Sequence, residues 1–473
     1  MPSPTPSDLS EASEETICAI ATAIGHAAIG IVRVSGPAAF SIVQPLFAGR
    51  GTLSDFASHT VHYGRVRNPE DGAIIDEALF LVMKGPYSYT GEAMIEIQSH
   101  GNPLVLQQIV ACLIGQGARL AAPGEFTRRA FLSGRIDLAQ AEAVMEVIAA
   151  QSESHRAWAL GQLKGELSAT IGDLRERLLS MLSHVEASID FIEQGIVVYK
   201  PAEMVAEVSA VQTAVRALLA SYRHGRVVRE GKTVVIAGRP NVGKSSLLNR
   251  LVGEARAIVT PQPGTTRDLV ESWVRWNDLA LRIVDTAGIR ESHDPIEQEG
   301  VRRGQEAIRT ADLVLLVLDA SVPLLPDDLS WIALLDAEIA ARDGRVLLTL
   351  NKSDLPRRID LASLPGSAVS ISTVTGVGFD DLKRAMADAL KMAPEKEQPL
   401  VGLLRHHDAL ARADLALQRA VAAAAEGQKS ASWEFLAVDL REAADFLGEI
   451  LGTSPVVDDA LLDRIFNQFC IGK

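Results

Sequence analysis

The pattern of apolar and polar residues changes along the chain, and three different patterns can be recognised. Each pattern predicts a different kind of domain. Up to about Leu132, apolar residues occur in short runs or alternate with polar residues, and one segment has helical spacing. We therefore expect an α+β domain over residues 1–133, with the Pro-, Ser- and Glu-rich residues 1–14 disordered. The predicted strands are Ile29–Val34, Ala78–Met83 and Met94–Gln98, and the predicted helix is Asn102–Ile114.

Long amphipathic helices are predicted for the next segment, Ile136–Tyr222. Proline and glycine become sparse there, and apolar residues recur every three or four positions. Lys200-Pro201 marks a break, after which Glu203–Leu219 resumes the helix. The basic stretch Arg223–Lys232 contains two glycines and is interpreted as a solvated linker, with contact to RNA as the alternative. The first part of a helical domain is thus expected at residues 134–229.

Short apolar runs alternate with helical segments between residues 230 and 394, which is the rhythm of a doubly wound parallel sheet. From Leu400 to Phe469 the long helices return, and Ala411–Ala425 is especially rich in alanine. Helices on both sides of an α/β segment predict one helical domain that is interrupted by an inserted domain at 230–394 and completed at 395–473. The predicted strands of the insert are Thr233–Ala237, Ala280–Val284, Leu313–Leu318, Arg345–Leu350 and Ala368–Ile371.

Composition and charge narrow the class of protein. A length of 473 residues suggests about three domains, and 47% hydrophobic with 22% charged residues is typical of soluble globular proteins. The net charge of −14 argues against a broad surface that coats nucleic acid. The three cysteines, Cys18, Cys112 and Cys470, lie too far apart for a metal site or a disulfide framework. Together with the absence of a signal peptide and of any membrane-spanning apolar run, this predicts a cytoplasmic protein.

The candidate chemistry begins at Gly238–Ser245, which has the pattern G-x-x-x-x-G-K-S. The segment stands between the predicted strand Thr233–Ala237 and a helix that begins near Ser246. In this context the glycines allow backbone N–H groups to surround a phosphate chain, and the helix presents its positive end to the same phosphates. Lys244 can place its ammonium on the β- and γ-phosphates, and the Ser245 hydroxyl can bind Mg²⁺.

Further elements follow in the order that a GTPase requires. Gly264–Asp268 contains two threonines in a Pro/Gly-rich loop, where a hydroxyl can reach Mg²⁺ and the γ-phosphate. Asp285–Gly288 ends an apolar strand and offers a carboxylate to Mg²⁺ and a backbone N–H to the γ-phosphate. Asn351–Asp354 ends another strand, and the Asp354 carboxylate can accept two N–H bonds from guanine but not from adenine. Ser372 belongs to a weaker fifth element. The function class is nucleotide hydrolysis or nucleotide-gated switching.

Two features of other switch GTPases are missing from these motifs. Ile289 stands where a Ras-like switch carries its catalytic glutamine, and no residue marks an arginine finger. Water positioning and charge neutralisation are therefore expected to come from elsewhere.

The chain resembles the MnmE (TrmE) family of tRNA-modification GTPases from about residue 16 to its last residue. Besides the GTPase motifs, the resemblance rests on motifs at both ends of the chain. These are Gly30–Gly36, Tyr89–Glu92, Glu96–Gln98, His100-Gly101, Pro123–Phe131, Asp137–Glu142 and the final Phe469-Cys-Ile-Gly-Lys473.

The resemblance implies an N-terminal domain that binds a 5,10-methylene- or 5-formyl-tetrahydrofolate as the source of a one-carbon unit. It implies a homodimer joined through these N-terminal domains, and a heterotetramer with an FAD-dependent partner of the MnmG type. Together they would add an aminomethyl or carboxymethylaminomethyl group at C5 of the wobble uridine of certain tRNAs. The GTPase is expected to be activated by K⁺ and by dimerisation of the G domains.

The resemblance also assigns site residues. The expected K⁺ ligands are Asn241, Thr260, Gln262 and Thr265, and the expected Mg²⁺ ligands are Ser245 and Thr266. Glu297 matches the glutamate that orients the attacking water, although by itself it reads as a carboxylate on a helix surface. The folate-binding positions are Arg33, Glu96, Arg135 and Lys473. The GTP-binding set is Asn241, Val242, Gly243, Lys244, Ser245, Ser246, Thr260, Pro261, Gln262, Pro263, Gly264, Thr265, Thr266, Asp285, Thr286, Ala287, Gly288, Asn351, Lys352, Asp354 and Ser372.

Some positions depart from the family pattern, and one has two readings. Gly25-His-Ala-Ala replaces a Gly/Arg-rich loop, Arg135 stands where lysine is usual, and Thr373 replaces a common alanine. Cys470 is either a small hydrophobe near the chain end or, as we favour, a catalytic thiol at the folate site. The competing function is a ribosome-assembly GTPase of the Era or Der type, which the motif at 469–473 and the absence of a basic RNA-binding domain after Asp354 disfavour.

Overall fold

The computed structural model describes residues 15–190, 201–254, 256–257, 270–276, 279–285, 307–340, 345–390, 400–425, 430–455 and 457–473. The chain divides into two compact units. The first comprises Met1–Met145, Gln162–Arg216 and Asp408–Lys473, and the second comprises Glu146–Gly161 and Ala217–His407. No helix of the described ranges is long and apolar enough to cross a membrane.

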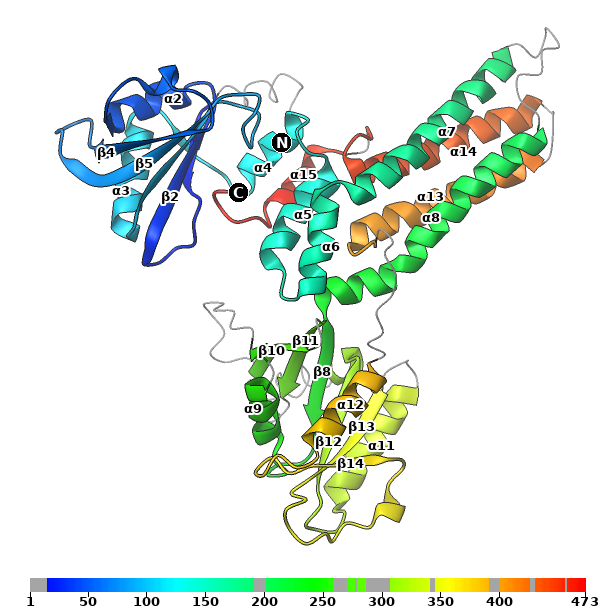
Figure 1. Cartoon of the computed structure of the whole chain (residues 1–473). Helices are drawn as coiled ribbons and strands as arrows, with labels where there is room; N and C mark the ends of the chain where they lie inside the picture. The colour runs from blue at the N-terminus through cyan, green and yellow to red at the C-terminus, as the bar shows by residue number, and fades with distance from the viewer. Residues whose placement is uncertain are drawn as a thin grey trace, which may run out of the picture. The chain divides into compact units, whose positions relative to one another are not determined.

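A seven-stranded sheet with the strand order β3-β4-β5-β6-β2-β1-β7 opens the first unit (Figure 1). Neighbouring strands are antiparallel except for β1 and β7, which are parallel. The sheet and its helices confirm the predicted α+β character, and β5 and β6 both extend beyond the predicted runs. The strands are β1 Ile17–Ile20, β2 Ala27–Ser35, β3 Phe47–Ala48, β4 Thr60–Arg67, β5 Ile74–Met83, β6 Met94–Gly101 and β7 Arg119–Leu120.

The core of this domain lies on one face of the sheet, where α3 (Pro103–Gly115) packs and where α2 (Ala39–Val43) adds its apolar residues. Alternate residues such as Val32, Phe80 and Ile97 are buried there together with Leu106 and Ile109 of α3. Period-two alternation sends the remaining residues of each strand to the opposite face. That face leaves Val61, Tyr63 and Leu79 exposed.

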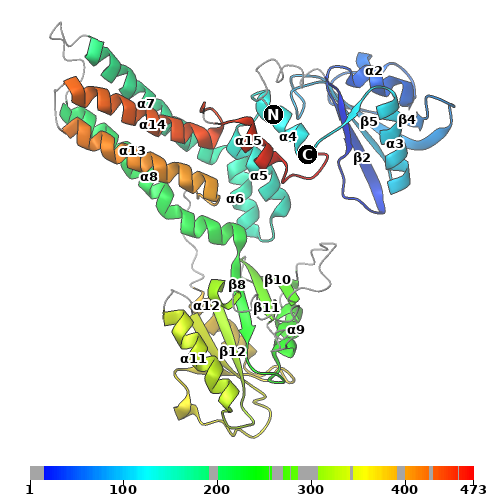
Figure 2. The same cartoon turned by 180° about the vertical axis from the view of Figure 1, so that it is seen from behind.

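Long helices make up the rest of the first unit, as the sequence predicts. α7 lies side by side with α14 (Figures 1 and 2), and its apolar residues Leu167, Ile171, Leu174 and Leu178 are buried at helical spacing. Gln212 and Arg216 of α8 both donate to Asp414 of α13. The helices are α4 Glu125–Leu132, α5 Leu138–Ala149, α6 Glu153–Leu163, α7 Glu166–Asp190, α8 Pro201–Glu230, α13 Leu404–Ala425, α14 Ser430–Leu451 and α15 Asp459–Phe466. Most of α6 and the second half of α8 belong to the second unit.

The basic stretch Arg223–Lys232 is not the solvated linker that the sequence predicts. Helix α8 continues through it to Glu230. Gly225 is buried inside the helix, and a Cβ at this position would collide with the carbonyl oxygen of Val401. The glycine is therefore required by the close approach of another backbone, and it does not interrupt the helix.

The second unit contains a seven-stranded sheet with the order β14-β13-β12-β8-β11-β10-β9. Strand β8 pairs in parallel with both β11 and β12, and β12, β13 and β14 continue the parallel arrangement. Helices α9 and α12 pack on one face of the sheet and α11 packs on the other. The elements are β8 Lys232–Ala237, α9 Lys244–Glu254, β9 Arg256–Ala257, β10 Val270–Trp276, β11 Leu279–Asp285, β12 Leu313–Asp319, α11 Pro326–Ala340, β13 Arg345–Asn351, β14 Ala368–Ser370 and α12 Phe379–Ala389.

The predicted parallel pairing is confirmed for β8, β11, β12, β13 and β14, and one edge of the sheet departs from it. Strand β10, which the sequence does not predict, runs antiparallel to β11, and β9 runs antiparallel to β10. Only two residues separate β10 from β11. A connection of that length permits a hairpin, whereas a parallel pair needs a crossover of a dozen residues or more.

Candidate functional site

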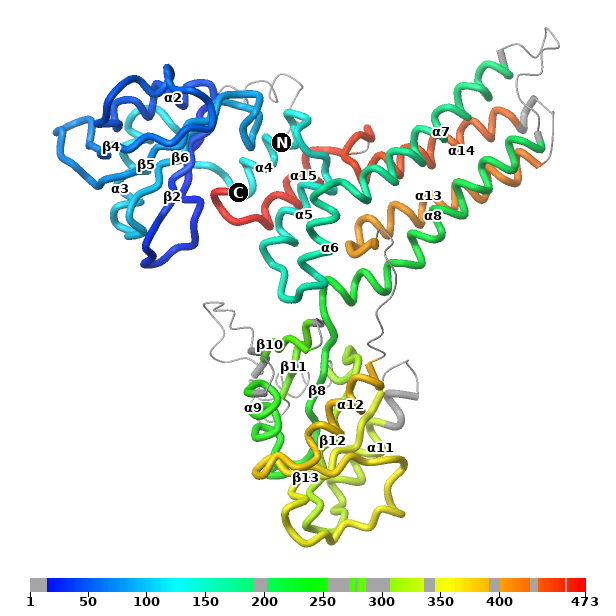
Figure 3. The backbone as a smooth tube through the Cα atoms, viewed as in Figure 1, coloured from blue at the N-terminus to red at the C-terminus, as the bar shows by residue number. Residues whose placement is uncertain are grey.

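The phosphate-binding motif lies at the carboxyl end of β8, which is buried in the centre of the second unit's sheet (Figure 3). Gly238 follows the strand directly and has φ 140°. A Cβ there would collide with the carbonyl oxygen of Val317 on the neighbouring strand β12. Only glycine therefore lets the chain leave the sheet at this point and wrap toward α9.

Lys244, the first residue of α9, is enclosed by the loop that precedes it. Its Nζ donates to the carbonyl oxygens of Gly238 at 2.8 Å and Arg239 at 3.0 Å. Burial lowers the pKa of Lys244, and the nearby Asp285 carboxylate opposes this effect. The ammonium is thus held at the start of a helix, where anionic phosphate oxygens are favoured.

Ser245 and Asp285 meet because β8 and β11 are parallel neighbours, and parallel strands end at the same edge of a sheet. The Ser245 hydroxyl donates to Oδ2 of Asp285 at 2.9 Å, and Asp285 is buried. A hydroxyl and a carboxylate beside a phosphate-binding loop are the hard oxygen donors that Mg²⁺ prefers. The two residues fit a Mg²⁺ ion, although no group of three or more His, Cys, Asp or Glu side chains in the described ranges is arranged to hold a metal.

The Asn351–Asp354 motif is tied to the phosphate-binding loop by a buried amide. Nδ2 of Asn351 donates to the carbonyl oxygen of Val242 at 2.8 Å, and its Oδ1 accepts from the backbone N–H of Thr373 at 3.1 Å. Gly243, with φ 100°, leaves room for this amide, which a Cβ would displace. Asn351 therefore joins three loops at the edge of the sheet.

Asp354 is exposed and is oriented by the fifth motif. The Ser372 hydroxyl is buried and donates to Oδ1 of Asp354 at 2.6 Å, and it accepts from the backbone N–H of Thr375 at 3.1 Å. A fixed, accessible carboxylate at this place suits the paired N–H donors of guanine. Ser372, which the sequence analysis assigned to a weak fifth element, therefore orients the Asp354 carboxylate.

Asp319 belongs to this site and was missed by the sequence analysis. Oδ2 of Asp319 accepts from Nζ of Lys352 at 2.6 Å and lies 3.8 Å from Nη2 of Arg239 in the phosphate-binding loop. Burial raises the pKa of Asp319, but the hydrogen bonds from Lys352 and Ser321 outweigh it and hold the pKa below its ordinary value. A signal was present, because Asp319 ends an apolar strand just as Asp285 and Asn351 do.

A second candidate site lies in the first unit, where Arg33 and Glu96 face each other on the paired strands β2 and β6. The Arg33 guanidinium donates through Nε and Nη2 to Oε1 of Glu96, at 2.9 and 2.8 Å. Its central carbon lies 5.5 Å from the ring centroids of both Tyr89 and Phe126. The two rings, which the sequence analysis did not assign to the site, stabilise the cation.

The last residues of the chain join this pair. The carbonyl oxygen of Gly472 accepts from Nη1 of Arg33 at 3.1 Å. Gly472 has φ 97°, and a Cβ there would collide with the carbonyl oxygen of Ile20 on β1. Burial and repulsion from Arg33 lower the pKa of Lys473, and Glu96 and the Cys470 thiol oppose this. Arg33, Glu96, Cys470 and Lys473, which are far apart in sequence, are thus brought together.

Arg135 lies close enough to the ring of Tyr89 for its charge to affect the pKa of Tyr89. Burial raises the pKa of Tyr89, and the hydrogen bond with Thr127 and the charges of Arg33 and Arg135 oppose this. Cys470 is exposed, and its thiol forms no disulfide with another described cysteine. The site therefore combines three cationic side chains, one carboxylate, two aromatic rings and a thiol.

Part of the predicted nucleotide site lies outside the described residues, including Glu297 and most of the expected K⁺ ligands. The residues concerned are Thr260, Pro261, Gln262, Pro263, Gly264, Thr265, Thr266, Thr286, Ala287, Gly288 and Glu297.

Comparison with known proteins gives matches over nearly the whole chain. Residues 16–135 match the family described as GTP-binding protein TrmE N-terminus, and residues 138–470 match the family described as MnmE helical domain. A tRNA modification GTPase MnmE of Symbiobacterium thermophilum is 46% identical over 467 residues, covering 97% of this chain and 100% of the relative. The protein of the same description from Geobacter sulfurreducens is 45% identical over 468 residues, covering 97% and 99%.

Solved structures resemble parts of the chain at low TM-scores. Era of Aquifex aeolicus bound to GDP and AlF4⁻ is 25% identical, with a TM-score of 0.27, over 40% of this chain and 67% of that chain. The G domain of the T. maritima FeoB iron transporter is 26% identical, with a TM-score of 0.27, over 33% of this chain and 98% of that chain. The family assignment rests on the sequence matches alone.

Proposed function

Because the chain belongs to the MnmE family of tRNA modification GTPases, which are GTP hydrolases that act in tRNA modification, we propose that it modifies the wobble uridine. It would use a tetrahydrofolate one-carbon unit and an FAD-dependent MnmG-type partner to add an aminomethyl or carboxymethylaminomethyl group at C5. The observation that carries the proposal is the meeting of Arg33, Glu96 and the Gly472 carbonyl at one place in the first unit.

The residues at this place fit a folate. The Glu96 carboxylate can accept from the amino group and ring N–H of a pterin, and the cations of Arg33, Arg135 and Lys473 suit carboxylates of the glutamyl end. The rings of Tyr89 and Phe126 offer faces for stacking. When bound, a 5,10-methylene- or 5-formyl-tetrahydrofolate supplies the one-carbon unit. The exposed Cys470 thiol would take part in the modification chemistry at this place.

In the second unit we assign GTP to the loop of residues 238–245 and to Asp354. Lys244 would bind the β- and γ-phosphates, and the Asp354 carboxylate would select guanine. Ser245, with Thr266, would hold Mg²⁺, which neutralises charge on the phosphates when it is bound. Asn241, Thr260, Gln262 and Thr265 would hold K⁺ in place of an arginine finger, and Glu297 would orient the attacking water.

The open face of the N-terminal sheet supports a homodimer. Val61 and Tyr63 of β4 and Leu79 of β5 are 53%, 62% and 42% exposed, and Tyr63 is paired with Leu79 across the strands. Contiguous apolar side chains on a surface mark interaction sites. We assign this face to a second copy of the chain, and the FAD-dependent partner would complete a heterotetramer in the cytoplasm.

The domain boundaries that fit this function are those expected from the sequence. They are 1–133 for the folate-binding and dimerisation domain, 134–229 and 395–473 for the two parts of the helical domain, and 230–394 for the inserted G domain. The pairing of α7 with α14 supports this division, because it joins helices from before and after the insert.

Complementation of a deletion strain tests the function. Cells that carry Cys470→Ser, Arg33→Ala or a chain without Phe469–Lys473 should lose the modified wobble uridine in nucleoside mass spectrometry. Purified variants should keep GTPase activity, because these residues belong to the first unit and the nucleotide motifs to the second. Normal modification in the deletion strain itself, with defective ribosome assembly, would instead identify a ribosome-assembly GTPase. Normal modification with Cys470→Ser would remove the thiol from the mechanism.

A further inference from the structure

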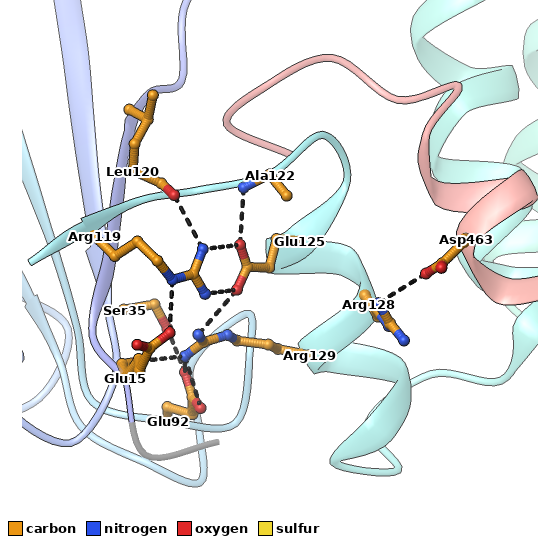
Figure 4. Close-up of polar contacts among 10 residues, drawn as sticks. All are labelled: Glu15, Ser35, Glu92, Arg119, Leu120, Ala122, Glu125, Arg128, Arg129 and Asp463. Carbon is orange, nitrogen blue, oxygen red and sulfur yellow. Dashed lines mark hydrogen bonds and ion pairs between the residues drawn. The ribbon is translucent and has the colours of Figure 1, made fainter. Parts of the chain in front are cut away.

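Helix α4 turns two adjacent arginines in opposite directions (Figure 4). Arg129 points into the N-terminal domain, where its guanidinium lies 3.1 Å from Glu92 and 3.0 Å from Glu125. Arg128 points toward α15, where Nη2 lies 3.0 Å from Asp459 and Nη1 lies 3.0 Å from Asp463. The short helix therefore connects the sheet to the helix that precedes the chain end.

On the sheet side, α4 is fixed by a closed network of ion pairs. Arg129 is only 7% exposed, and Glu125 also binds Arg119 through both of its carboxylate oxygens. Glu92 accepts from the hydroxyl of Ser35 at 2.8 Å, and Ser35 lies two residues after Arg33 on β2. Burial raises the pKa of Glu125, but the contacts with Arg119, the Ala122 N–H and Arg129 leave it below its ordinary value. The network thus joins α4 to the strand that carries Arg33.

On the side of α15, Nη1 and Nη2 of Arg128 each donate a hydrogen bond to an aspartate of that helix. Asp459 and Asp463 are one helical turn apart, so that the two branches of one guanidinium can bind both carboxylates at once. Nε of Arg128 is buried and has no hydrogen-bond partner among the described residues. An unsatisfied buried donor is unfavourable. The hydrogen bonds of this guanidinium therefore come from Nη1 and Nη2, to Asp463 and Asp459.

Helix α15 leads directly into the segment Phe469–Lys473, called the tail here. Phe466 and Phe469 are buried beside Leu138, and Gly124 at the start of α4 approaches Phe466 so closely that a Cβ would lie 2.6 Å from its carbonyl oxygen. Three residues beyond Phe469, the Gly472 carbonyl binds Arg33. The exposed Cys470 lies between these two anchors, and Arg128 holds the first of them.

We propose that Arg128 is a positioning residue, whose paired bonds to Asp459 and Asp463 set where Cys470 and Lys473 stand relative to Arg33 and Glu96. The inference deepens the proposed function, since it assumes that the tail and the Arg33–Glu96 pair form one folate site. Arg128 itself acts through α15 and touches none of the reacting groups.

The test compares four variants of the full-length protein. Arg128→Gln removes the charge, Arg128→Lys keeps the charge without the two-branched geometry, and Arg128→Asp with Asp463→Arg restores one ion pair in reversed order. Arg156→Gln is the matched control, because Arg156 makes an exposed ion pair with Glu153 in the second unit. Two quantities are measured: the alkylation rate of Cys470 by iodoacetamide without folate, followed by peptide mass spectrometry, and the Kd of 5-formyl-tetrahydrofolate from calorimetry.

With Arg128→Gln, Cys470 should be alkylated faster and the Kd should rise, each by about tenfold, as the loss of two charge-assisted hydrogen bonds predicts. Arg128→Lys should give a smaller change, the reversed pair should recover much of the loss, and Arg156→Gln should behave as wild type. GTPase activity should not change in any of them. Rescue by the reversed pair distinguishes positioning from a general loss of stability, and it remains informative if Arg128→Gln folds poorly.

Unchanged alkylation and unchanged Kd with Arg128→Gln would overturn the inference, because Phe466 and Phe469 would then suffice to place the tail. Failure of the reversed pair to recover either quantity would also overturn it. A wild-type protein that does not bind the folate, while Arg128→Gln still accelerates alkylation, would preserve the positioning role and reject the folate function.

Discussion

Asp319 binds Lys352 through a 2.6 Å contact between Oδ2 and Nζ, and this pair connects the guanine motif to the phosphate-binding loop. Lys352 has φ 65°, an uncommon backbone conformation for a residue with a side chain. Such a conformation persists only where the surroundings determine it. The Asp319 carboxylate holds the Nζ end of the Lys352 side chain, and strand β13 holds the preceding residue, Asn351. Both contacts help to determine the backbone conformation of Lys352.

Asp319→Asn should therefore weaken the binding of GTP and GDP alike, by about tenfold, because a charge-assisted contact near the base is lost. The affinities are measured with fluorescent nucleotides. Lys352→Gln should add little once Asp319 is changed, because partners in one interaction are not additive. Asp328→Asn is the matched control, since this carboxylate is also buried and binds Arg239 but not Lys352. Additive losses from Asp319 and Lys352 would show that the pair does not act as a unit.

Asp354→Asn should abolish the preference for guanine, because a carboxylate accepts two N–H donors and an amide offers one acceptor oxygen. Xanthine nucleotides should now compete better than guanine nucleotides in equilibrium binding. Ser372→Ala should give a weaker form of the same defect, because its hydroxyl orients the carboxylate at 2.6 Å. A GTP preference that survives Asp354→Asn would reject the assignment.

GTP hydrolysis should be much slower in NaCl than in KCl at equal ionic strength. The motivation is the resemblance of Asn241 and of Thr260–Gly264 to the family's K⁺ site, together with the missing arginine finger. Steady-state rates in the two salts are compared, with nucleotide affinity as the control. Equal rates would exclude a monovalent cation as the source of the neutralising charge.

Glu297→Ala should keep GTP affinity and lose kcat by about 10²–10⁴-fold, the range for removal of a general base. Glu297→Gln, which keeps the size of the side chain, should be nearly as inactive. Single-turnover hydrolysis with saturating protein separates the chemical step from binding. A rate within a few-fold of wild type would place the water-orienting group elsewhere.

The second unit should lose part of its stability in acid, because contacts of the Glu146 carboxylate within that unit depend on its charge. Glu146 of α5 accepts from Nε of Arg229 at 2.8 Å, near the end of α8, and contacts the His155 ring at 3.0 Å. Burial raises the pKa of Glu146, but the His155 and Arg229 contacts leave it below the ordinary value of 4.5. A depressed carboxyl pKa stabilises the fold at pH values above 4.5, and this contribution is lost as pH falls through the folded-state pKa.

The Tm difference between wild type and Glu146→Gln should therefore be largest near pH 6 and should shrink below pH 4.5. Glu153→Gln is the control, since its partner Arg156 forms an exposed pair of little energetic value. A Tm difference that does not vary with pH would show that the ionised state of Glu146 makes no contribution.

The order of motifs and the type of most elements were determined by the sequence, because both depend on short stretches of chain. The run Thr233–Ala237 followed by Gly238–Ser245 predicts a strand, a phosphate-binding loop and a helix, and β8 and α9 confirm the two elements. Apolar residues at helical spacing likewise predicted long amphipathic helices over Ile136–Tyr222, and α7 is one of them. The spacing of apolar residues reflects which face of a single helix or strand is buried. It can therefore be read from a short stretch of sequence.

Contacts between distant segments were decided only by the tertiary structure. Arg33 and Gly472 are 439 residues apart, and they meet because α4 binds α15 on one side and is joined to the N-terminal domain by Arg129 on the other. The hairpin of β10 and β11, the helical Arg223–Glu230 stretch and the Asp319–Lys352 pair depend in the same way on which strands and backbones become neighbours. Strand register and helix docking follow from the packing of the whole core, and no local pattern of residues encodes them.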